Sequence, residues 1–494
     1  MVKTMILEKL LENIDYQLIQ GDLKQNVSQI DYDSRQVINE SLFVCLPGSK
    51  VDGHHYAKNA VLSGAKVIVI EKKVDYQEGV TYLLVKNARY ALAILSCAFF
   101  HHPSHQMTVI GITGTKGKTT TSYMVESILN HAGKKVGIIG TIGSVINGEY
   151  RKTKNTTPES FELQRLMYEM VLSGCEYCVM EVSSQGLMLD RVAGIDFDYG
   201  VFTNLSPDHI SEHEHHSFEH YMECKKKLFH MCKIGFFNKD DEHYEDMIAG
   251  AKCQIQTFSM KTKSNLQAYD SRLSRGKGTL GVSFSTRGLI SDQFEVDIPG
   301  EFSVYNSLVA LMLCYALNIE TIHMKEALKK VRVKGRVEII PTQQDYTIMI
   351  DYAHNAVSFE NILQTIQAYY PKRLICLYGS VGERTEGRRY EMGEIVSRYG
   401  AFSILTADNP GTEPIHTINQ GIIEGLNVHQ GEYIEIEDRK EAIVYALKHA
   451  QDGDVILCLG KGHEDYQLID GIEVPFSEKM VIQNYFDKKS KIHI

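Results

Sequence analysis

The sequence lacks the features that would place it among membrane-spanning, nucleic-acid-binding or disulfide-rich proteins. No apolar run reaches the roughly 18 residues that a membrane-spanning helix needs. Basic residues are in deficit, with 52 Lys+Arg against 62 Asp+Glu and a formal net charge of −10. This balance argues against a broad nucleic-acid surface, although a local basic pocket for an anionic ligand is compatible with it. The ten cysteines are scattered singly, which is typical of the reducing cytoplasm and not of a disulfide framework.

The overall composition is typical of a globular protein, and the length indicates several domains. At roughly 150 residues per domain, 494 residues predict about three domains. The opening segment, MVKTMILEKLLENIDYQ, resembles an amphipathic helix with acidic residues and not a signal peptide. We predict an N-terminal domain over residues 1–105, a central domain over 106–334 and a C-terminal domain over 335–494.

Apolar strands with glycine-bearing turns alternate with helical patterns through most of the chain. MTVIGITG precedes a helix predicted over Lys118–Ala132, and a helix near Ser160–Ser173 precedes the strand YCVMEVS. This alternation predicts a parallel sheet with right-handed crossovers, and an antiparallel patch is predicted near residues 279–297. From about Gly335 the strands YTIMIDYAH, RLICLYGS, FSILTADNP and DVILCLGKG repeat the pattern, which predicts a second doubly wound sheet.

The strongest local signal is the segment Val109–Thr120, VIGITGTKGKTT, between a strand and a helix. Backbone N–H groups of such a glycine-rich turn, with the helix N-terminus, can cradle the phosphates of a nucleotide. Lys118 would contact the terminal phosphates, and the Thr119 hydroxyl would reach Mg²⁺. The glycines depart from the common GxxxxGK[ST] spacing, and a glycine turn without a ligand is the alternative. The predicted fold class is α/β, with a small α/β N-terminal domain, a central P-loop parallel-sheet domain and a C-terminal Rossmann-like domain.

The variant TGTxGKT[ST] resembles the ATP loop of the Mur ligases and the folylpolyglutamate synthetases, which activate a carboxylate as an acyl phosphate. The likeness extends over nearly the whole chain and is greatest to Mur ligases that add the third amino acid of peptidoglycan (the MurE type). The motifs that carry it are Asp33–Arg35, Gly48–Gly53, Asn155–Pro158, Glu181–Ser184, Asn204–His209, Tyr221–Phe229, Asp351–His354, Gly382–Arg384, Asp408–Pro410 and Gly460–Glu464. Each motif alone is weak, whereas their number, order and spacing together are specific.

The resemblance implies an ATP-dependent ligase that adds a third, dibasic amino acid to UDP-MurNAc-L-Ala-D-Glu in peptidoglycan precursor synthesis. The implied catalytic residues are Lys118, Glu181, His209 and Lys225. Two Mg²⁺ ions are implied, and their ligands are Thr119, Glu181, His209 and Lys225, the last carrying a CO₂-derived carbamate. An ordinary strand-end carboxylate at Glu181 and a solvated lysine run over residues 225–227 are the alternatives. Successive helical residues point about 100° apart, so at most one of the three lysines faces the site, and the motif selects Lys225.

The resemblance also assigns binding residues by position. For ATP they are Gly114, Thr115, Lys116, Gly117, Lys118, Thr119, Thr120, Asn306, Arg336, Asp351 and His354. For the UDP-MurNAc-dipeptide they are Ser34, Ser49, Lys50, Val51, Asn155, Thr156, Thr157, Ser183 and Arg191. For the incoming amino acid they are Arg384, Asp408, Asn409, Pro410, Gly411, Gly460 and Glu464. Lys50 is chemically suited to a diphosphate, and Arg191 can pair bidentately with a carboxylate.

Two local patterns suggest other metal chemistry. Five histidines between residues 209 and 220 could bind a transition metal, but acidic interruptions and a loop context favour a polar surface with His209 as the sole ligand. Cys175-Glu-Tyr-Cys178 is a CxxC without a partner at zinc spacing, and it enters a buried strand. We therefore interpret this pair as structural.

Several positions depart from the family pattern. At four positions the residue differs from the usual family residue but remains compatible with catalysis: Lys116, Gln185, Leu189 and Ser303. Gly411 is more informative, because ligases for meso-diaminopimelate typically read Asp-Asn-Pro-Arg there, and the Arg holds the distal carboxylate. Loss of that charge-assisted partner, a class worth about 1.5–3 kcal/mol, favours L-lysine or L-ornithine. Against this, Arg384, Gly460 and Glu464 are as in the diaminopimelate enzymes, and substitutes for the Arg could be Thr412, Glu413 or Arg388.

Three other functions are weighed against this interpretation. A folylpolyglutamate-type ligase would lack the N-terminal UDP-binding domain. A nucleotide switch would hydrolyse ATP without any amino acid, and a divergent Mur ligase paralogue would have little ligase activity. We expect a cytoplasmic monomer that has no nucleic-acid partner and no membrane span.

Overall fold

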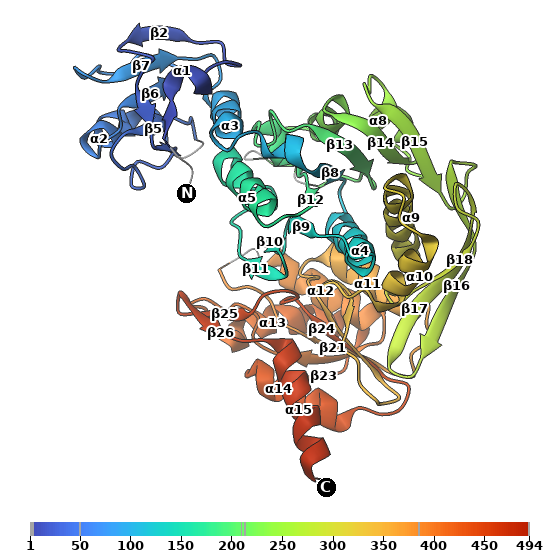
Figure 1. Ribbon diagram of the computed structural model, residues 1–494. Coiled ribbons are helices and arrows are strands. Elements are labelled where there is room, and N and C mark those ends of the chain that lie inside the picture. Colours follow the sequence, from blue (N-terminus) through green and yellow to red (C-terminus); the bar gives the residue numbers. More distant parts are fainter. Residues whose placement is uncertain (1–3, 49–50, 209, 212–213, 384–385, 493–494) are drawn as a thin grey trace. The chain divides into compact units, whose positions relative to one another are not determined.

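The computed structural model describes residues 4–48, 51–208, 210–211, 214–383 and 386–492. The chain forms two compact units, Met1–Gln267 with Leu308–Met324, and Ala268–Ser307 with Lys325–Ile494 (Figure 1). All ten cysteines are free thiols, and nine of them are buried. Among the described residues, no helix combines the length and the apolar character that crossing a membrane requires.

A five-stranded sheet builds the N-terminal part of the first unit, with the strand order β2-β7-β6-β5-β4. Its strands are β2 (Gln17–Gln20), β4 (Gln29–Asp31), β5 (Ser41–Val44), β6 (Val67–Ile70) and β7 (Thr81–Leu84). Its helices are η1 (Gly53–Tyr56), α2 (Ala57–Leu62) and α3 (Ala88–Phe99), and η2 (Pro103–Gln106) follows α3. Strands β4 to β7 pair in parallel, because α2 and the connecting loops carry the chain back between them.

The prediction of a helix for the opening segment is largely wrong. Among the described residues of this segment, only α1 (Leu7–Leu10) is helical, and β1 (Met5–Ile6) before it pairs antiparallel with β3 (Asn26–Val27). The apolar side chains of Leu7 and Leu10 are buried, as an amphipathic pattern requires. The pattern thus located the buried face, whereas the backbone pairing of β1 with a distant strand shortened the helix.

The first nine strands of the eleven-stranded central sheet have the order β11-β10-β9-β12-β8-β13-β14-β15-β16. Its strands are β8 (Thr108–Thr113), β9 (Val136–Ile139), β10 (Ser144–Ile146), β11 (Glu149–Arg151), β12 (Tyr177–Glu181), β13 (Phe197–Phe202), β14 (Cys232–Asn238), β15 (Gln254–Ser259) and β16 (Leu266–Gly276). Its helices are α4 (Lys118–His131), α5 (Ser160–Leu172), α6 (Ser184–Met188), α7 (Phe218–Lys226), η3 (Lys227–His230) and α8 (Tyr244–Ile248). Parallel pairing joins β9, β12, β8, β13, β14 and β15, in that order across the sheet. Glu181 at the end of β12 lies opposite Ile112 of β8. The loops that follow these two strands therefore meet at one sheet edge.

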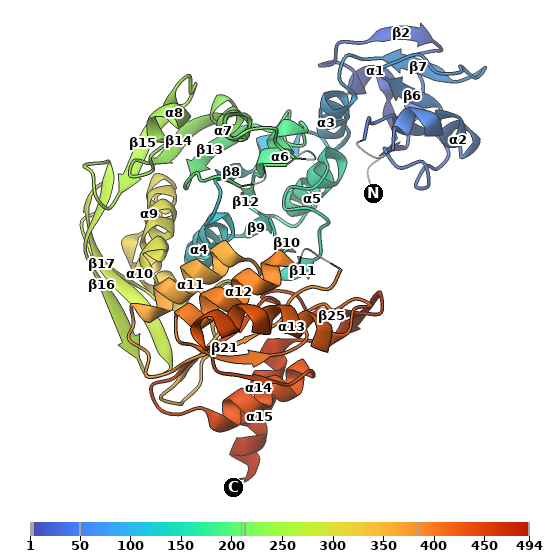
Figure 2. The same ribbon diagram turned by 180° about the vertical axis from the view of Figure 1, so that it is seen from behind.

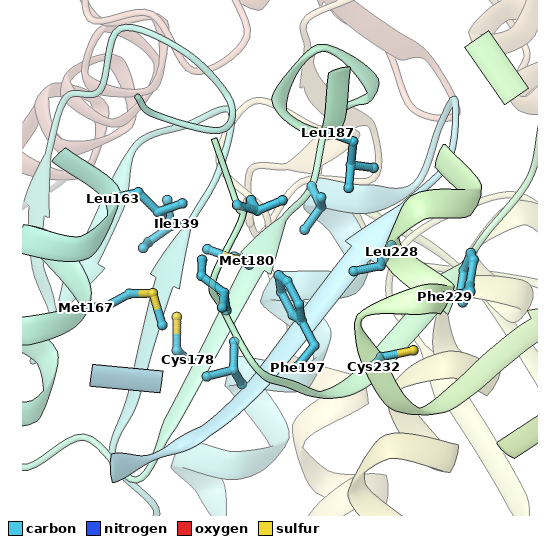
Figure 3. Packing of buried hydrophobic residues seen from close by; sticks show 14 of the residues in the cluster. Ile139, Leu163, Met167, Cys178, Met180, Leu187, Phe197, Leu228, Phe229 and Cys232 are labelled. Carbon is cyan, nitrogen blue, oxygen red and sulfur yellow. The ribbon is translucent and has the colours of Figure 1, made fainter. Parts of the chain in front are cut away.

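Apolar side chains from this sheet and its helices form the core beneath that edge (Figure 3). Met180 of β12, Phe197 of β13, Met167 of α5 and Leu228 of η3 are fully buried in it. Cys178 belongs to the same cluster and has no exposed surface, which agrees with a structural role for the CxxC pair.

The second unit contains the predicted antiparallel patch and the second parallel sheet. Strand β17 (Thr279–Gly288) pairs antiparallel with β18 (Gln293–Val296), and α9 (Glu301–Ala316) and α10 (Thr321–Lys330) follow in the chain. The C-terminal sheet has the order β19-β20-β24-β21-β22-β23. Its strands are β19 (Glu338–Ile339), β20 (Thr347–Asp351), β21 (Leu374–Tyr378), β22 (Phe402–Leu405), β23 (Tyr433–Glu435) and β24 (Val455–Leu459), and β25 (Tyr466–Ile469) and β26 (Ile472–Pro475) form a hairpin.

Helices cover both faces of the C-terminal sheet (Figure 2). On one face lie α11 (Ala356–Gln367), α12 (Gly387–Arg398) and α13 (Ile415–Leu426), which η4 (Asn427–His429) follows; on the other lie α14 (Arg439–His449) and α15 (Glu478–Ile492). The predicted α/β fold class with a doubly wound C-terminal domain is confirmed.

Candidate active site

The loop between β8 and α4 (residues 114–117) is the predicted phosphate loop. Gly114 and Gly117 have positive φ angles of 146° and 87°. A Cβ on Gly114 would lie 2.0 Å from Thr203 Oγ1, so only glycine fits there. The Lys118 ammonium donates to the carbonyl oxygens of Gly114 at 2.8 Å and Thr115 at 3.1 Å. The ammonium and the first N–H groups of α4 together favour bound phosphate.

Contacts from the Asn204 turn and from α7 hold this loop in place. The backbone N–H of Lys116 donates to Asn204 Oδ1 at 2.9 Å, and the Thr115 N–H donates to the Asn204 carbonyl at 2.9 Å. The hydroxyls of Thr115 and Tyr221 lie 3.1 Å apart. Three segments that are distant in the sequence therefore meet at the phosphate loop.

Glu181 is a buried carboxylate at the end of β12, with 1% of its surface exposed. Its Oε1 accepts from Thr119 Oγ1 at 2.8 Å and from the Thr141 N–H at 2.9 Å, and its Oε2 accepts from Thr141 Oγ1 at 3.0 Å. A Cβ on Gly140 would lie 2.3 Å from Oε1, so the backbone is shaped around this carboxylate. A buried carboxylate beside the hydroxyl of Thr119 is an oxygen donor set of the kind that Mg²⁺ prefers, and Thr120 is buried in the same helical turn.

Lys225 of α7 is buried at the same loop, with 1% of its surface exposed. Its Nζ donates to the Gly114 carbonyl at 3.0 Å, the same oxygen that Lys118 contacts, and lies 4.4 Å from the ring centre of Tyr221. Burial and the nearby charge of Lys118 hold the pKa of Lys225 well below its usual range. The surroundings therefore disfavour the charged form of this amine relative to water.

The two lysines that follow point elsewhere, as the helical spacing predicts. Lys226 pairs with Glu223 at 2.8 Å, and Lys227 donates to the Leu187 carbonyl at 3.3 Å. Of the three lysines, Lys225 is the one at the phosphate loop.

The residues predicted to hold the dipeptide form a network directly after Glu181. Thr157 Oγ1 donates to the Glu181 carbonyl at 2.9 Å and accepts from the Ser183 N–H at 2.9 Å. Arg191 donates from Nη1 to the Thr157 carbonyl at 3.0 Å and pairs with Glu159 at 2.8 Å. The guanidinium that we assigned to a substrate carboxylate is thus already held by a protein carboxylate.

The other predicted dipeptide and UDP residues are more open. The hydroxyl oxygens of Thr156 and Thr141 lie 3.1 Å apart. Asn155 and Val51 are exposed, and Ser34 is half-buried. Four predicted residues lie outside the described part of the chain: Ser49, Lys50, His209 and Arg384.

The predicted ATP residues Asn306, Arg336, Asp351 and His354 belong to the second unit. Asp351 ends β20, and its carboxylate accepts from the N–H groups of Val337 at 2.7 Å and Ala353 at 2.8 Å. Burial raises the pKa of Asp351 above its usual range. His354 Nδ1 lies 2.8 Å from the Tyr352 carbonyl, and Arg336 lies over the Tyr352 ring at 5.0 Å. Asn306 is buried within α9.

The predicted amino-acid loops after β22 and β24 converge around a buried lysine that the sequence analysis did not assign. Lys461 Nζ donates to Asn409 Oδ1 at 2.7 Å and to Glu464 Oε2 at 2.8 Å, and lies 3.8 Å from Asp408 Oδ1. A Cβ on Gly460 would lie 2.4 Å from Asp408 Oδ2. The structure therefore brings Asp408, Asn409, Gly460 and Glu464 together, and Lys461 joins them.

Gly411 and Pro410 continue the first of these loops. Gly411 has a positive φ of 62°. Two of the three substitutes considered for a missing arginine have other partners: Thr412 Oγ1 donates to Glu383, and Glu413 pairs with Arg389 at 2.6 Å. Neither side chain is thus placed to replace a guanidinium at position 411.

Arg439 is a second residue that the sequence analysis missed. It begins α14, is fully buried, and donates to the carbonyl oxygens of Ala407 at 3.1 Å and Leu459 at 2.8 Å. These carbonyls directly precede Asp408 and Gly460, so one guanidinium fixes both loops. Its charge is compensated by Glu478 of α15, at 2.7 Å. No local pattern marks either residue, because their pairing spans 39 positions.

We expect Glu478→Gln to lower the free energy of unfolding of the second unit by about 3 kcal/mol, because it removes the carboxylate that pairs with Arg439 in the interior. The exposed i,i+4 pair of Lys330 and Glu326 offers a control, and Glu326→Gln should cost less than about 0.5 kcal/mol. Urea unfolding, followed by a probe in the C-terminal sheet, compares the two. Equal midpoints would contradict the role given to the buried pair.

In comparisons with known proteins, relatives match nearly the whole length of this chain. Residues 26–100 match the Mur ligase family, catalytic domain; residues 112–314 match the Mur ligase middle domain; residues 335–462 match the Mur ligase, glutamate ligase domain. A UDP-N-acetylmuramoyl-L-alanyl-D-glutamate–2,6-diaminopimelate ligase from Clostridium perfringens is 39% identical, over 98% of this chain and 100% of its own. A ligase of the same name from Caldanaerobacter subterraneus subsp. tengcongensis is 40% identical, over 99% and 100%. A solved structure of that name superposes with a TM-score of 0.72 and 25% identity, covering 99% of this chain and 100% of the other.

Proposed function

Because this chain belongs to the Mur ligase family of ATP-dependent, amide-forming ligases, we propose that it joins 2,6-diaminopimelate to the D-glutamate carboxylate of UDP-MurNAc-L-Ala-D-Glu. The reaction makes a peptidoglycan precursor, and we place it in the cytoplasm, with the enzyme acting as a monomer. The single observation that carries this proposal is the convergence of Lys118, Lys225 and the Glu181–Thr119 pair at one phosphate loop. A match over the whole length of the relatives, including residues 26–100, favours this function over a folylpolyglutamate-type ligase.

The phosphate loop prepares ATP for attack. Its N–H groups and Lys118 hold the β- and γ-phosphates and neutralise the charge that spreads over the γ-phosphoryl oxygens during transfer. A carboxylate oxygen of the D-glutamate attacks the γ-phosphorus, the bond to the β-phosphate oxygen breaks, and ADP leaves. Glu181 and Thr119 are suited to hold Mg²⁺, which would supply further positive charge at this site when bound.

Lys225 acquires a negative charge by reaction with CO₂. Its neutral amine attacks the carbon of CO₂, forms a carbamate and releases one proton. The buried amine with a lowered pKa supports this step, and the adjacent Lys118 ammonium would stabilise the anion once it forms. The resulting carbamate oxygens are suited to a second Mg²⁺ ion, whose other proposed ligand is His209.

The network after Glu181 positions the acid to be activated. Thr157, Ser183 and Arg191 line the turn that follows β12, so a carboxylate bound by Arg191 would lie near the phosphate loop. Asn155 and Thr156 extend this surface, while Ser34, Ser49, Lys50 and Val51 hold the UDP part. In this arrangement Arg191 contacts both Glu159 and the substrate carboxylate. The contact with Glu159 keeps the guanidinium in its orientation.

The amine completes the reaction on the acyl phosphate. It attacks the acyl carbon, phosphate leaves, and the amine loses a proton as the amide forms. Asp408 and Glu464 offer carboxylate oxygens to the ammonium groups of the amino acid, and Lys461 holds both side chains in position. Arg384, Asn409, Pro410, Gly411 and Gly460 complete the proposed amino-acid site.

Diaminopimelate is the proposed acceptor because both relatives described above carry it in their names. Gly411 taken alone favours L-lysine or L-ornithine, since no side chain at this position can pair with a distal carboxylate. A panel of amino acids decides between these acceptors.

We expect phosphate release only when ATP, UDP-MurNAc-L-Ala-D-Glu and a diamino acid are all present. The assay compares meso-diaminopimelate, L-lysine and L-ornithine, and mass spectrometry of the nucleotide identifies the product. Diaminopimelate should give the largest kcat/KM. Phosphate release that does not depend on any amino acid would instead support a nucleotide switch, and no release with any of them would support a paralogue without ligase activity.

A further inference from the structure

One histidine of the histidine-rich segment, His215, does not belong to the polar surface that the sequence suggests, whereas His216 is exposed. His215 is fully buried, and its Nε2 lies 2.9 Å from Ser184 Oγ at the start of α6. His220 and Cys224 lie one helical turn apart on α7, and Cys224 is buried. One nitrogen of each histidine and the Cys224 sulfur lie within 4.8 Å of one another.

We propose that His215, His220 and Cys224 bind a transition-metal ion, with zinc as the best match. Imidazole nitrogen and thiolate sulfur are the donors that Zn²⁺ prefers, whereas Mg²⁺ prefers oxygen. Two imidazoles and a thiolate therefore differ in chemistry from the ligands of the proposed Mg²⁺ sites, which are oxygen atoms apart from His209. Three protein ligands leave a fourth position for water, and binding releases the thiol proton of Cys224 to solvent.

The surroundings of the two histidines suit this role. A hydrogen bond from His215 Nε2 to Ser184 would fix the tautomer that leaves a lone pair on Nδ1, as is common for metal-bound histidine. His220 Nδ1 is a buried atom without a hydrogen-bond partner among the described residues. Zn–N and Zn–S lengths place tetrahedral ligand atoms roughly 3.3–3.7 Å apart, so closure needs shifts of about 1 Å. Neighbouring positions on one face of α7 allow such shifts through side-chain rotation.

A metal here would act on the part of the chain that carries the proposed active site. Helices α6 and α7 pack side by side (Figure 2). Ser184 begins α6 directly after Ser183, and Lys225 follows Cys224 on α7. The ion would therefore link the residue 215 loop to α7 one residue before Lys225 and reduce the motion of this helix.

The test uses the full chain, stripped with a chelator and then titrated with Zn²⁺ in the presence of excess Mg²⁺. We expect one tightly bound Zn²⁺ per chain by calorimetry and elemental analysis after dialysis. Co²⁺ in its place should give the absorption of a tetrahedral ion with a thiolate ligand. His220→Ala and Cys224→Ser should each weaken Zn²⁺ binding at least about 100-fold.

His243→Ala is the matched control, because this histidine precedes α8 and lies outside the group. It should keep the wild-type affinity. Wild-type protein that retains no Zn²⁺, or Zn²⁺ held equally by His220→Ala and Cys224→Ser, would overturn the proposal. Circular dichroism verifies that both variants fold. The readout is independent of ligase activity, so its failure would leave the proposed function intact.

Discussion

Lys225→Ala is expected to lower kcat of the ligase by about 10³-fold or more, since it removes the anion that we assign to the second Mg²⁺ site. The KM for the amino acid should change little, because the predicted amino-acid residues belong to the other unit. Short carboxylates such as acetate or propionate should restore part of the activity, because the missing side chain leaves space beside Gly114 and Tyr221. Phosphate release with all substrates present measures both effects.

Lys226→Ala is the matched control for this experiment. Lys226 is the next residue of the same helix but pairs with Glu223 and does not contact the phosphate loop. Its replacement should leave kcat within about twofold, because a helical i,i+3 ion pair with an exposed partner contributes little. Full activity of Lys225→Ala would refute the carbamate role, and equal losses in both variants would show that the effect comes from the helix and not from Lys225.

Glu181→Gln is expected to lower kcat by about 10²–10³-fold and to raise the Mg²⁺ concentration needed for half-maximal activity. Glutamine has the shape of glutamate, so its amide oxygen can still accept from Thr119 and from the Thr141 N–H. The fold should therefore survive while the negative charge beside the phosphate loop is lost. Activity measured over a Mg²⁺ titration separates loss of the metal ligand from general damage.

Glu176→Gln offers a comparison on the same strand segment. Glu176 immediately precedes β12, is exposed and pairs with Lys134 at 3.0 Å. This variant should show wild-type kcat and Mg²⁺ dependence. An unchanged Mg²⁺ requirement in Glu181→Gln would mean that Glu181 serves the hydrogen-bond network alone.

Much of the fold could be predicted because its signals are local. The strand, glycine turn and Lys-Thr sequence of the phosphate loop specify its conformation within about ten residues, and the helix predicted over Lys118–Ala132 ends within one residue of the observed α4. The strands from YTIMIDYAH to DVILCLGKG are short apolar runs with polar ends, and all four are found in the C-terminal sheet. Selection of Lys225 from three lysines needed only helical geometry and the motif.

The remaining features depend on contacts between distant residues. The helix at the N-terminus is cut short by the pairing of β1 with β3, some twenty residues later, which an amphipathic pattern cannot reveal. Arg439 meets Glu478 through the packing of α14 on α15, and Lys461 was part of a quoted motif without an assigned role. His215 was taken for a surface residue because polar neighbours surround it in sequence, whereas the fold buries it against Ser184.

The central claim is that Lys225 becomes an anion by taking up CO₂ beside the phosphate loop. Carbon-13 NMR of the wild-type protein equilibrated with ¹³C-labelled bicarbonate tests it most directly. We predict one carbamate resonance that is present in wild type and Lys226→Ala and absent from Lys225→Ala. A wild-type spectrum without that resonance, or a resonance that persists in Lys225→Ala, would contradict the claim.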